Sequence, residues 1–223
     1  MKEIKIATRA SKLALAQATQ VRTLLASTAP DVPVSIVEIS TKGDRDTSDF
    51  LYQASSIGVF TSEVEQALLD GRADIAVHSL KDLPTTITKG LTISAIPQRE
   101  QVHDVIVAAK DITSVQDLPK GAAIGTSSVR RIAQLKLVHP DLNCQPLRGN
   151  IETRIRKVQE GELDAIVIAR AGLNRLGLSG HISLILGAED FVPAPGQGAL
   201  AVQTRKDNTE LCELVCKLDD PNA

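Results

Sequence analysis

Aromatic residues are scarce in this chain of 223 residues, which has no Trp, one Tyr and three Phe, or 2% in all. Proteins that bind single-stranded nucleic acid stack the bases on aromatic side chains, so this scarcity argues against that function. The formal net charge of −2 provides no overall positive field for nucleic acid either. The composition therefore predicts no nucleic-acid partner.

Long apolar runs are also missing. No run approaches the roughly 18 to 20 residues that a membrane span needs, and the first residues, MKEIKIATRAS, lack the apolar segment of a secretory signal. Three Cys fit a reducing compartment better than a disulfide framework. No His and Cys spacing predicts a metal site. We therefore expect a cytoplasmic protein without a membrane partner and without a metal.

Short apolar runs alternate with segments of helical periodicity along the chain. The expected strands are 3–8, 34–40, 73–77, 91–96, 102–109, 122–125, 144–147, 163–169 and 200–204. The expected helices are 11–28, 61–70, 128–138, 150–160 and 207–218. Ser62 and Glu65 have the spacing of a capping box at the start of the second helix.

Two successive β-α-β-α-β patterns predict an α/β fold with two domains, each built on a mostly parallel sheet. Composition breaks at 96–103 and 192–198 predict two crossover segments, after which the last strand and helix return to the first domain. The expected domains are 1–97 with 198–218, and 98–197, with 219–223 starting a linker. Because ligands in such folds bind beyond the carboxyl ends of the strands, we expect a site in a cleft between the domains.

Arg and small hydroxyl residues recur where expected strands end, at 7–11, 78–82, 125–131 and 147–154. Gly-Thr-Ser-Ser before a helix offers backbone N–H groups and hydroxyls to an anion, and Arg side chains bind carboxylates with two hydrogen bonds. The alternative is that the hydroxyl residues only cap helices and the Arg side chains are solvated. Lys81-Asp82 allows two interpretations as well: a carboxylate that stabilises a cation on a ligand, or a surface ion pair.

Seven motifs resemble those of the porphobilinogen deaminase (hydroxymethylbilane synthase) family and occur in family order. They are ATRASKLALAQ, TKGD, GVFTSEVEQALLDGRADIAVHSLKDLP, GTSSVRR, LRGNIETR, LDAIVIARAGLNRLG and PAPGQGALAV. The resemblance implies a mostly monomeric transferase of tetrapyrrole and heme biosynthesis that condenses four porphobilinogen molecules into hydroxymethylbilane and releases ammonia. It also implies a type-2 periplasmic-binding-protein-like fold and a dipyrromethane cofactor attached to a cysteine of a third domain.

The resemblance also implies roles for individual residues. Asp82 is the expected catalytic carboxylate, which holds pyrrole N–H groups and stabilises the cation left when ammonia departs. The residues expected to bind the cofactor are Ser79, Lys81, Asp82, Thr126, Ser127, Ser128, Arg130 and Arg131. Those expected to bind the substrate or the growing chain are Arg9, Ser11, Arg148, Asn150, Arg154 and Gln197.

Two departures from the family pattern affect these expectations. Residues 55–58 read Ser-Ser-Ile-Gly where the family usually has Gly-Gly-Lys-Gly, so Ile57 replaces an expected Lys. None of Cys144, Cys212 and Cys216 lies in a Gly-Gly-Cys sequence, so we expect this chain to be a two-domain portion that lacks the third domain and the attachment cysteine. The alternative function is a non-catalytic binding module for an acidic, polycarboxylate small molecule.

Overall fold

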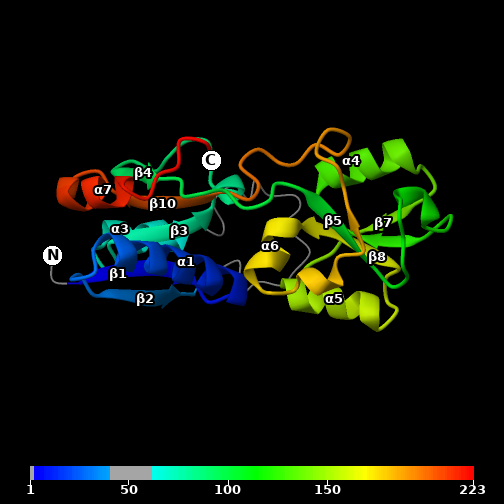
Figure 1. Ribbon diagram of the computed structural model, residues 1–223, viewed down its shortest axis with the longest axis horizontal. Coiled ribbons are helices and arrows are strands. Elements are labelled where there is room, and N and C mark those ends of the chain that lie inside the picture. Colours follow the sequence, from blue (N-terminus) through cyan, green and yellow to red (C-terminus); the bar gives the residue numbers. More distant parts are fainter. Residues whose placement is uncertain (1–2, 41–61) are drawn as a thin grey trace. The chain divides into compact units, whose positions relative to one another are not determined.

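The fold is described from a computed structural model, in which residues 3–40 and 62–223 are placed (Figure 1). They form two compact units, one of residues up to 100 with 199–223 and one of residues 101–198. The sequence places these boundaries at 97/98 and 197/198. Residues 219–223 lie in the first unit, where the backbone N–H of Ile96 donates to Asp219 Oδ1 (2.6 Å) and that of Asp220 to the Ile96 carbonyl (3.0 Å).

The first unit has a five-stranded sheet in the order β2-β1-β3-β10-β4. Its strands are β1 (Ile4–Arg9), β2 (Val34–Ile39), β3 (Ile75–Ser79), β4 (Leu91–Ala95) and β10 (Leu200–Arg205). Its helices are α1 (Lys12–Thr28), α3 (Ser62–Leu69) and α7 (Thr209–Cys216), with a short 3-10 helix at Leu80–Asp82. β10 runs antiparallel to both β3 and β4, so the other four strands share one direction.

The second unit repeats this plan, with the sheet order β7-β6-β8-β5-β9. Its strands are β5 (Asp104–Ala108), β6 (Ala123–Gly125), β7 (Asn143–Gln145), β8 (Ala165–Ala169) and β9 (Leu184–Ile185). Its helices are α4 (Val129–Val138), α5 (Ile151–Gln159) and α6 (Arg170–Arg175), with 3-10 helices at Val115–Asp117 and Ser179–His181. Here β5 is the antiparallel strand. The predicted α/β class with two mostly parallel sheets, and the return of the last strand to the first unit, are confirmed.

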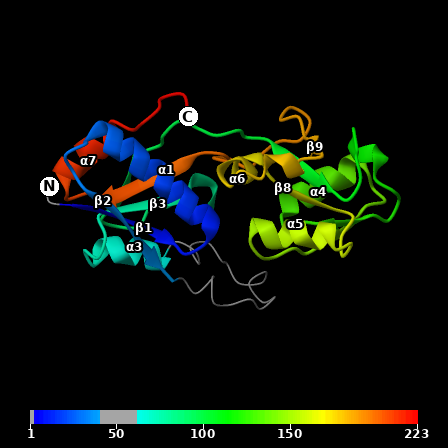
Figure 2. The same cartoon turned by 60° about the horizontal axis from the view of Figure 1, so that its bottom comes forward.

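Apolar side chains fill both faces of each sheet. In the first unit, α1 and α7 pack on one face through residues such as Val21 and Val215, and α3 packs on the other through Leu68 (Figure 2). In the second unit, α4 covers one face through Leu135 and α5 covers the other through Ile155, as Figure 1 shows. Helices on both faces leave the strand ends as the places where polar side chains gather.

Some expectations differ from the structure. β3 starts two residues later than predicted, and α6 and β9 were not predicted, because six and two residues are too short for a periodicity to show. The predicted capping box is wrong. Ser62 lies inside α3 and its hydroxyl donates to Glu63, while Glu65 accepts hydrogen bonds from Thr88 and Gln203.

In the described ranges, no helix is long and apolar enough to cross a membrane.

Candidate functional site

In the first unit, two clusters of predicted site residues lie at one edge of the sheet. Arg9 ends β1 and Ser11 comes two residues later, while Ser79 ends β3 and is followed by Lys81 and Asp82. β1 and β3 are parallel neighbours, with Ile6 opposite Ile75. Their carboxyl ends therefore meet at the same edge, in the way that the sequence predicted for ligand-binding residues.

Two hydroxyls at this edge have structural partners. Ser11 is the N-cap of α1 and accepts the backbone N–H of Ala14 at 3.2 Å. Ser79 Oγ accepts a hydrogen bond from the side chain of Gln17, which is buried in α1, at 2.9 Å. Each hydroxyl still has its own hydrogen to donate, so both remain suited to an anionic ligand. Gln17 was missed, because nothing in the sequence pairs it with a residue 62 positions away.

Asp82 differs from Ser11 and Ser79 because its side chain has no hydrogen-bond or ion-pair partner among the described residues. It ends the short 3-10 helix after β3, its side chain is exposed, and its carboxylate has no hydrogen-bond or ion-pair partner in residues 3–40 and 62–223. Within these ranges, Asp82 therefore does not form the surface ion pair that was the second interpretation of Lys81-Asp82. A bare carboxylate at this edge is available to N–H donors or to a positive charge on a ligand.

A buried polar network lies beneath this edge. The His78 ring nitrogen Nε2 contacts Gln203 Oε1 at 3.0 Å, and Gln203 Nε2 donates to Glu65 at 2.8 Å. Burial lowers the pKa of His78, with opposition from the Gln203 hydrogen bond and the Glu65 charge. His78 is thus neutral near pH 7. The network ties β3, which ends at Ser79 just before Lys81 and Asp82, to β10 and α3.

In the second unit, the loop after β6 is held by its own hydroxyls. Ser128 is the N-cap of α4 and accepts the Arg131 N–H at 3.4 Å, and Thr126 Oγ1 accepts the Ser128 N–H at 3.3 Å. Ser127 Oγ both donates to and accepts from the backbone of Leu147, each at 2.9 Å. Because the one hydroxyl hydrogen of Ser127 is used, its backbone N–H is the group left to meet a ligand.

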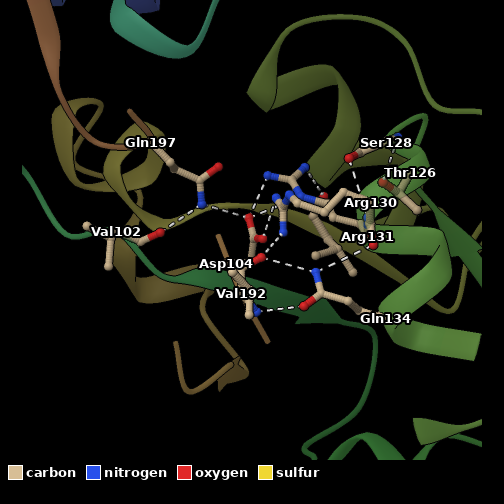
Figure 3. A network of polar contacts seen from close by, with 10 residues as sticks. Val102, Asp104, Thr126, Ser128, Arg130, Arg131, Gln134, Val192 and Gln197 are labelled. Atoms are coloured by element: carbon tan, nitrogen blue, oxygen red, sulfur yellow. Dashed lines mark hydrogen bonds and ion pairs between the residues drawn. The ribbon is translucent and has the colours of Figure 1, made fainter. Parts of the chain in front are cut away.

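Asp104 is the centre of a buried ion cluster (Figure 3). Its side chain is fully buried, and Arg131 Nε and Nη2 donate to Oδ1 at 3.1 and 2.6 Å, while Arg130 Nη2 lies 2.7 Å from Oδ2. Burial alone would raise the pKa of Asp104, but the charges and hydrogen bonds of Arg131 and Arg130 outweigh it and hold the pKa below its usual 3.8. Arg131 is 8% exposed, whereas a quarter of the Arg130 side chain remains accessible.

Residues of the same cluster also form hydrogen bonds with the second crossover segment, residues 192–198. Gln197, which is buried, donates from Nε2 to the Val102 carbonyl (2.8 Å) and to Asp104 Oδ1 (3.0 Å). Arg130 donates to the Val192 carbonyl at 2.6 Å, and Gln134 bonds both backbone groups of Val192. Figure 3 shows Arg130 and Arg131 from α4 and Gln197 from the crossover converging on Asp104, with Gln134 beside Val192. Gln197 thus has a structural role in the described contacts.

The loop after β7 and the first turns of α5 carry polar groups with fewer partners. Asn150 is the N-cap of α5 and accepts the Thr153 N–H at 2.9 Å, which leaves its amide hydrogens available. Arg154 Nε donates to the Gly149 carbonyl at 2.8 Å, and burial and then the charge of Arg131 lower the pKa of Arg154. Arg148 has no hydrogen bond or ion pair within the described part of the chain. These groups favour an added anion.

Gly125, the last residue of β6, allows the sheet and the loop to approach closely. A Cβ at this position would lie 2.7 Å from Leu163 and 2.8 Å from Leu147. We expect Gly125→Ala to lower the free energy of unfolding by about 1–3 kcal/mol, measured by urea denaturation, because the neighbouring leucines would have to shift. Gly180→Ala is the control, since a Cβ there meets nothing within 4 Å. Equal stability of the two variants would contradict this explanation.

The remaining sequence features carry less information. Ile57 and the TKGD motif lie outside the described residues. Among the residues that are placed, no group of three or more His, Cys, Asp or Glu side chains could hold a metal ion. Cys212 contacts Thr204 and the Arg205 carbonyl, Cys144 is half-buried in β7, and Cys216 is exposed.

A family model described as "Porphobilinogen deaminase, dipyromethane cofactor binding domain" matches residues 4–213. The chain belongs to the porphobilinogen deaminase family. The porphobilinogen deaminase of Maridesulfovibrio salexigens is 47% identical over 220 residues, covering 99% of this chain and 71% of the relative. That of Syntrophomonas wolfei is 48% identical over 219 residues, covering 98% and 71%. The resemblance seen in the sequence motifs is therefore confirmed over nearly the whole chain.

Solved structures confirm the fold at low sequence identity. A putative methionine-binding lipoprotein from Bacillus subtilis has a TM-score of 0.56 and 14% identity, covering 97% of this chain and 90% of that protein. The VFT2 domain of Bordetella pertussis BvgS has a TM-score of 0.54 and 18% identity, covering 96% and 85%. Both share the periplasmic-binding-protein-like architecture expected for this deaminase family.

The donor set of this porphobilinogen deaminase family member fits dipyrromethane, the cofactor of the matching family domain. The pyrrole carboxylates of that group need cationic and N–H donors. The first turn of α4 supplies the accessible Arg130, and the loops after β6 and β7 supply the free backbone N–H of Ser127 and the unpaired Arg148. The half-buried cation Arg154, whose pKa is lowered, also gains from a carboxylate.

Proposed function

We propose that this chain performs the family's transferase reaction, the condensation of four porphobilinogen molecules and one water into hydroxymethylbilane with release of four ammonia molecules. The product is a linear tetrapyrrole on the way to heme. Family membership over residues 4–213 supports this function.

The observation that carries the proposal is the unpartnered carboxylate of Asp82 at the carboxyl edge of the first sheet. When ammonia leaves the aminomethyl group of porphobilinogen, positive charge develops on the pyrrole, and a carboxylate beside it stabilises that charge. The same carboxylate accepts pyrrole N–H groups. A protein that only binds carboxylates gains nothing from a bare negative charge at its site.

The other predicted residues bind and orient carboxylates. For the cofactor, the proposed groups are Ser79, Lys81, Thr126, Ser127 through its N–H, Ser128, Arg130 and Arg131. Since Arg131 is buried on Asp104, we assign direct contact to Arg130 and give Arg131 the role of supplying charge. For the substrate and growing chain, the proposed groups are Arg9, Ser11, Arg148, Asn150 and Arg154, with Gln197 positioning the crossover.

Dipyrromethane, when bound, supplies the pyrrole carbon to which the first substrate unit is joined. This chain's own residues hold its carboxylates, keep Asp82 available and position the incoming ring.

The alternative of a non-catalytic binding module receives no support from the comparisons. The curated relatives at 47% and 48% identity are porphobilinogen deaminases. The binding proteins share only the fold, at 14% and 18% identity.

We also propose that the protein acts as a monomer in the cytoplasm, with porphobilinogen as its partner and neither nucleic acid nor membrane. The family resemblance, the low aromatic content and the charge of −2 support this. Light scattering during size-exclusion chromatography tests it, with a mass near 23.8 kDa expected. A mass twice as large would contradict a monomer.

The function is tested by incubating the purified chain with porphobilinogen and measuring both substrate loss and ammonia release. We expect equal molar amounts of the two, since each condensation releases one ammonia. Calorimetric titration with porphobilinogen gives a second readout. Binding without consumption would favour the binding module, and the absence of both would contradict the proposed function.

A further inference from the structure

Arg170 has no role assigned by the sequence motifs, yet it occupies the same kind of position as the predicted site residues. It directly follows β8 and begins α6. Its backbone N–H donates to the His103 carbonyl at 3.0 Å, just before β5. β5 and β8 are antiparallel, with Asp104 opposite Ala169, so His103 and Arg170 lie side by side at one sheet edge.

Both residues have a buried nitrogen that lacks a partner. Arg170 Nε and His103 Nδ1 are shielded from solvent and make no hydrogen bond. The Arg170 guanidinium as a whole has no hydrogen bond or ion pair with residues 3–40 or 62–223. Buried polar atoms in proteins are nearly always hydrogen-bonded, because an unmade bond is costly. Two such atoms without partners, on the neighbouring residues Arg170 and His103, indicate a site where the acceptor oxygens of a ligand would bind.

The position agrees with an anionic ligand. β8 lies between β6 and β5 and is parallel to β6. Arg170 after β8 and Thr126 after β6 therefore share a sheet edge. The acidic residue next to His103, Asp104, already pairs with Arg130 and Arg131. The negative charge of Asp104 is therefore not available to neutralise Arg170.

We propose that Arg170 and His103 form an additional carboxylate-binding subsite for one acetate or propionate side chain of the pyrrole ligand. The guanidinium binds both carboxylate oxygens, and an imidazole nitrogen that carries hydrogen donates to one of them. This subsite rests on the proposed function, because it assumes a pyrrole carboxylate as its ligand.

The test compares porphobilinogen binding to the wild-type chain and to Arg170→Gln by calorimetric titration. We expect binding about 10- to 100-fold weaker, as for loss of a charged hydrogen bond. Arg170→Lys, which keeps the charge but loses the planar fork, should fall between the two. Arg156→Gln is the matched control, since Arg156 is an exposed residue of the same unit paired with Glu160, and it should bind like wild type.

A second measurement does not depend on any variant. In NMR spectra of the wild-type chain, added porphobilinogen should shift the imidazole resonances of His103, while those of His181, exposed in the same unit, stay unchanged. Unaltered affinity of Arg170→Gln, or an unmoved His103 signal in a chain that binds porphobilinogen, would overturn the subsite and leave the proposed function standing. A wild-type chain that neither binds nor consumes porphobilinogen would overturn both.

Discussion

Asp82→Asn is expected to lower the rate of porphobilinogen consumption by about 10²- to 10³-fold, the usual effect of removing one group that stabilises charge in a transition state. The substitution keeps the size and shape of the side chain but removes its negative charge. Since the Asp82 carboxylate has no partner among the described residues, no fold contact is broken. The free energy of unfolding should therefore stay within about 0.5 kcal/mol of wild type.

The rate and the binding should respond differently. The anionic substrate is held by cations and N–H donors, so Asp82→Asn should bind porphobilinogen nearly as tightly as wild type, measured by calorimetry. Asp70→Asn is the control, because Asp70 lies in the same unit in a surface ion pair with Arg72, which contributes little. A variant at Asp82 that consumes substrate at the wild-type rate would remove this residue from the chemistry.

Much of the fold was predictable because it depends on local patterns. The apolar run at 163–169, interrupted only by Asp164, predicts a buried strand, and β8 (Ala165–Ala169) lies there. Ser128 and Asn150 were placed correctly at helix starts, because capping is a short-range interaction between a side chain and a backbone N–H three residues on.

The partners of buried polar residues were not predictable, because they depend on which strands become neighbours. Gln203 and His78 are 125 residues apart and meet only because β10 inserts beside β3. Asp104 carried one signal that was overlooked: it opens an apolar strand, and a carboxylate that becomes buried needs a cation. The sequence could not say that this cation comes from the two arginines expected to bind the cofactor.

The capping interpretation therefore holds for Ser128 and Asn150, whereas the anion-binding role of the same loops stays a prediction. Ser128 caps α4 and still has a hydroxyl hydrogen to donate, whereas the hydroxyl of Ser127 is fully used by Leu147. Capping hydroxyls and ion-paired arginines hold the loop after β6, and we expect ligand binding to depend most on the groups left unpaired, such as Arg148.

Asp104→Ala is expected to cause the largest loss of stability, about 3–5 kcal/mol, because it leaves Arg131 buried without its counter-ion. That is a large part of the roughly 5–15 kcal/mol by which domains are stable. Urea denaturation measures the loss. Asp141→Ala is the control, since Asp141 pairs with Lys120 on the surface of the same unit, and it should cost less than about 1 kcal/mol.

A double-mutant cycle separates this ion pair from other effects. Arg131→Ala should also destabilise the chain, but Asp104→Ala combined with Arg131→Ala should lose less stability than the sum of the two single variants, because no unpaired charge of the pair remains. Simple additivity of the two losses would show that the residues do not stabilise each other.

The same ion pair predicts how stability changes with pH. Burial alone would raise the pKa of Asp104, but Arg131 and Arg130 hold it below the usual 3.8, so the carboxylate is favoured in the folded state. Its stabilising contribution is present above the unfolded pKa of about 3.9 and is lost as the pH falls through the lower folded value. The difference in unfolding free energy between wild type and Asp104→Ala should thus be largest at about pH 5–7 and shrink below about pH 4. A difference that stayed constant into strong acid would mean that Asp104 does not act through its charge.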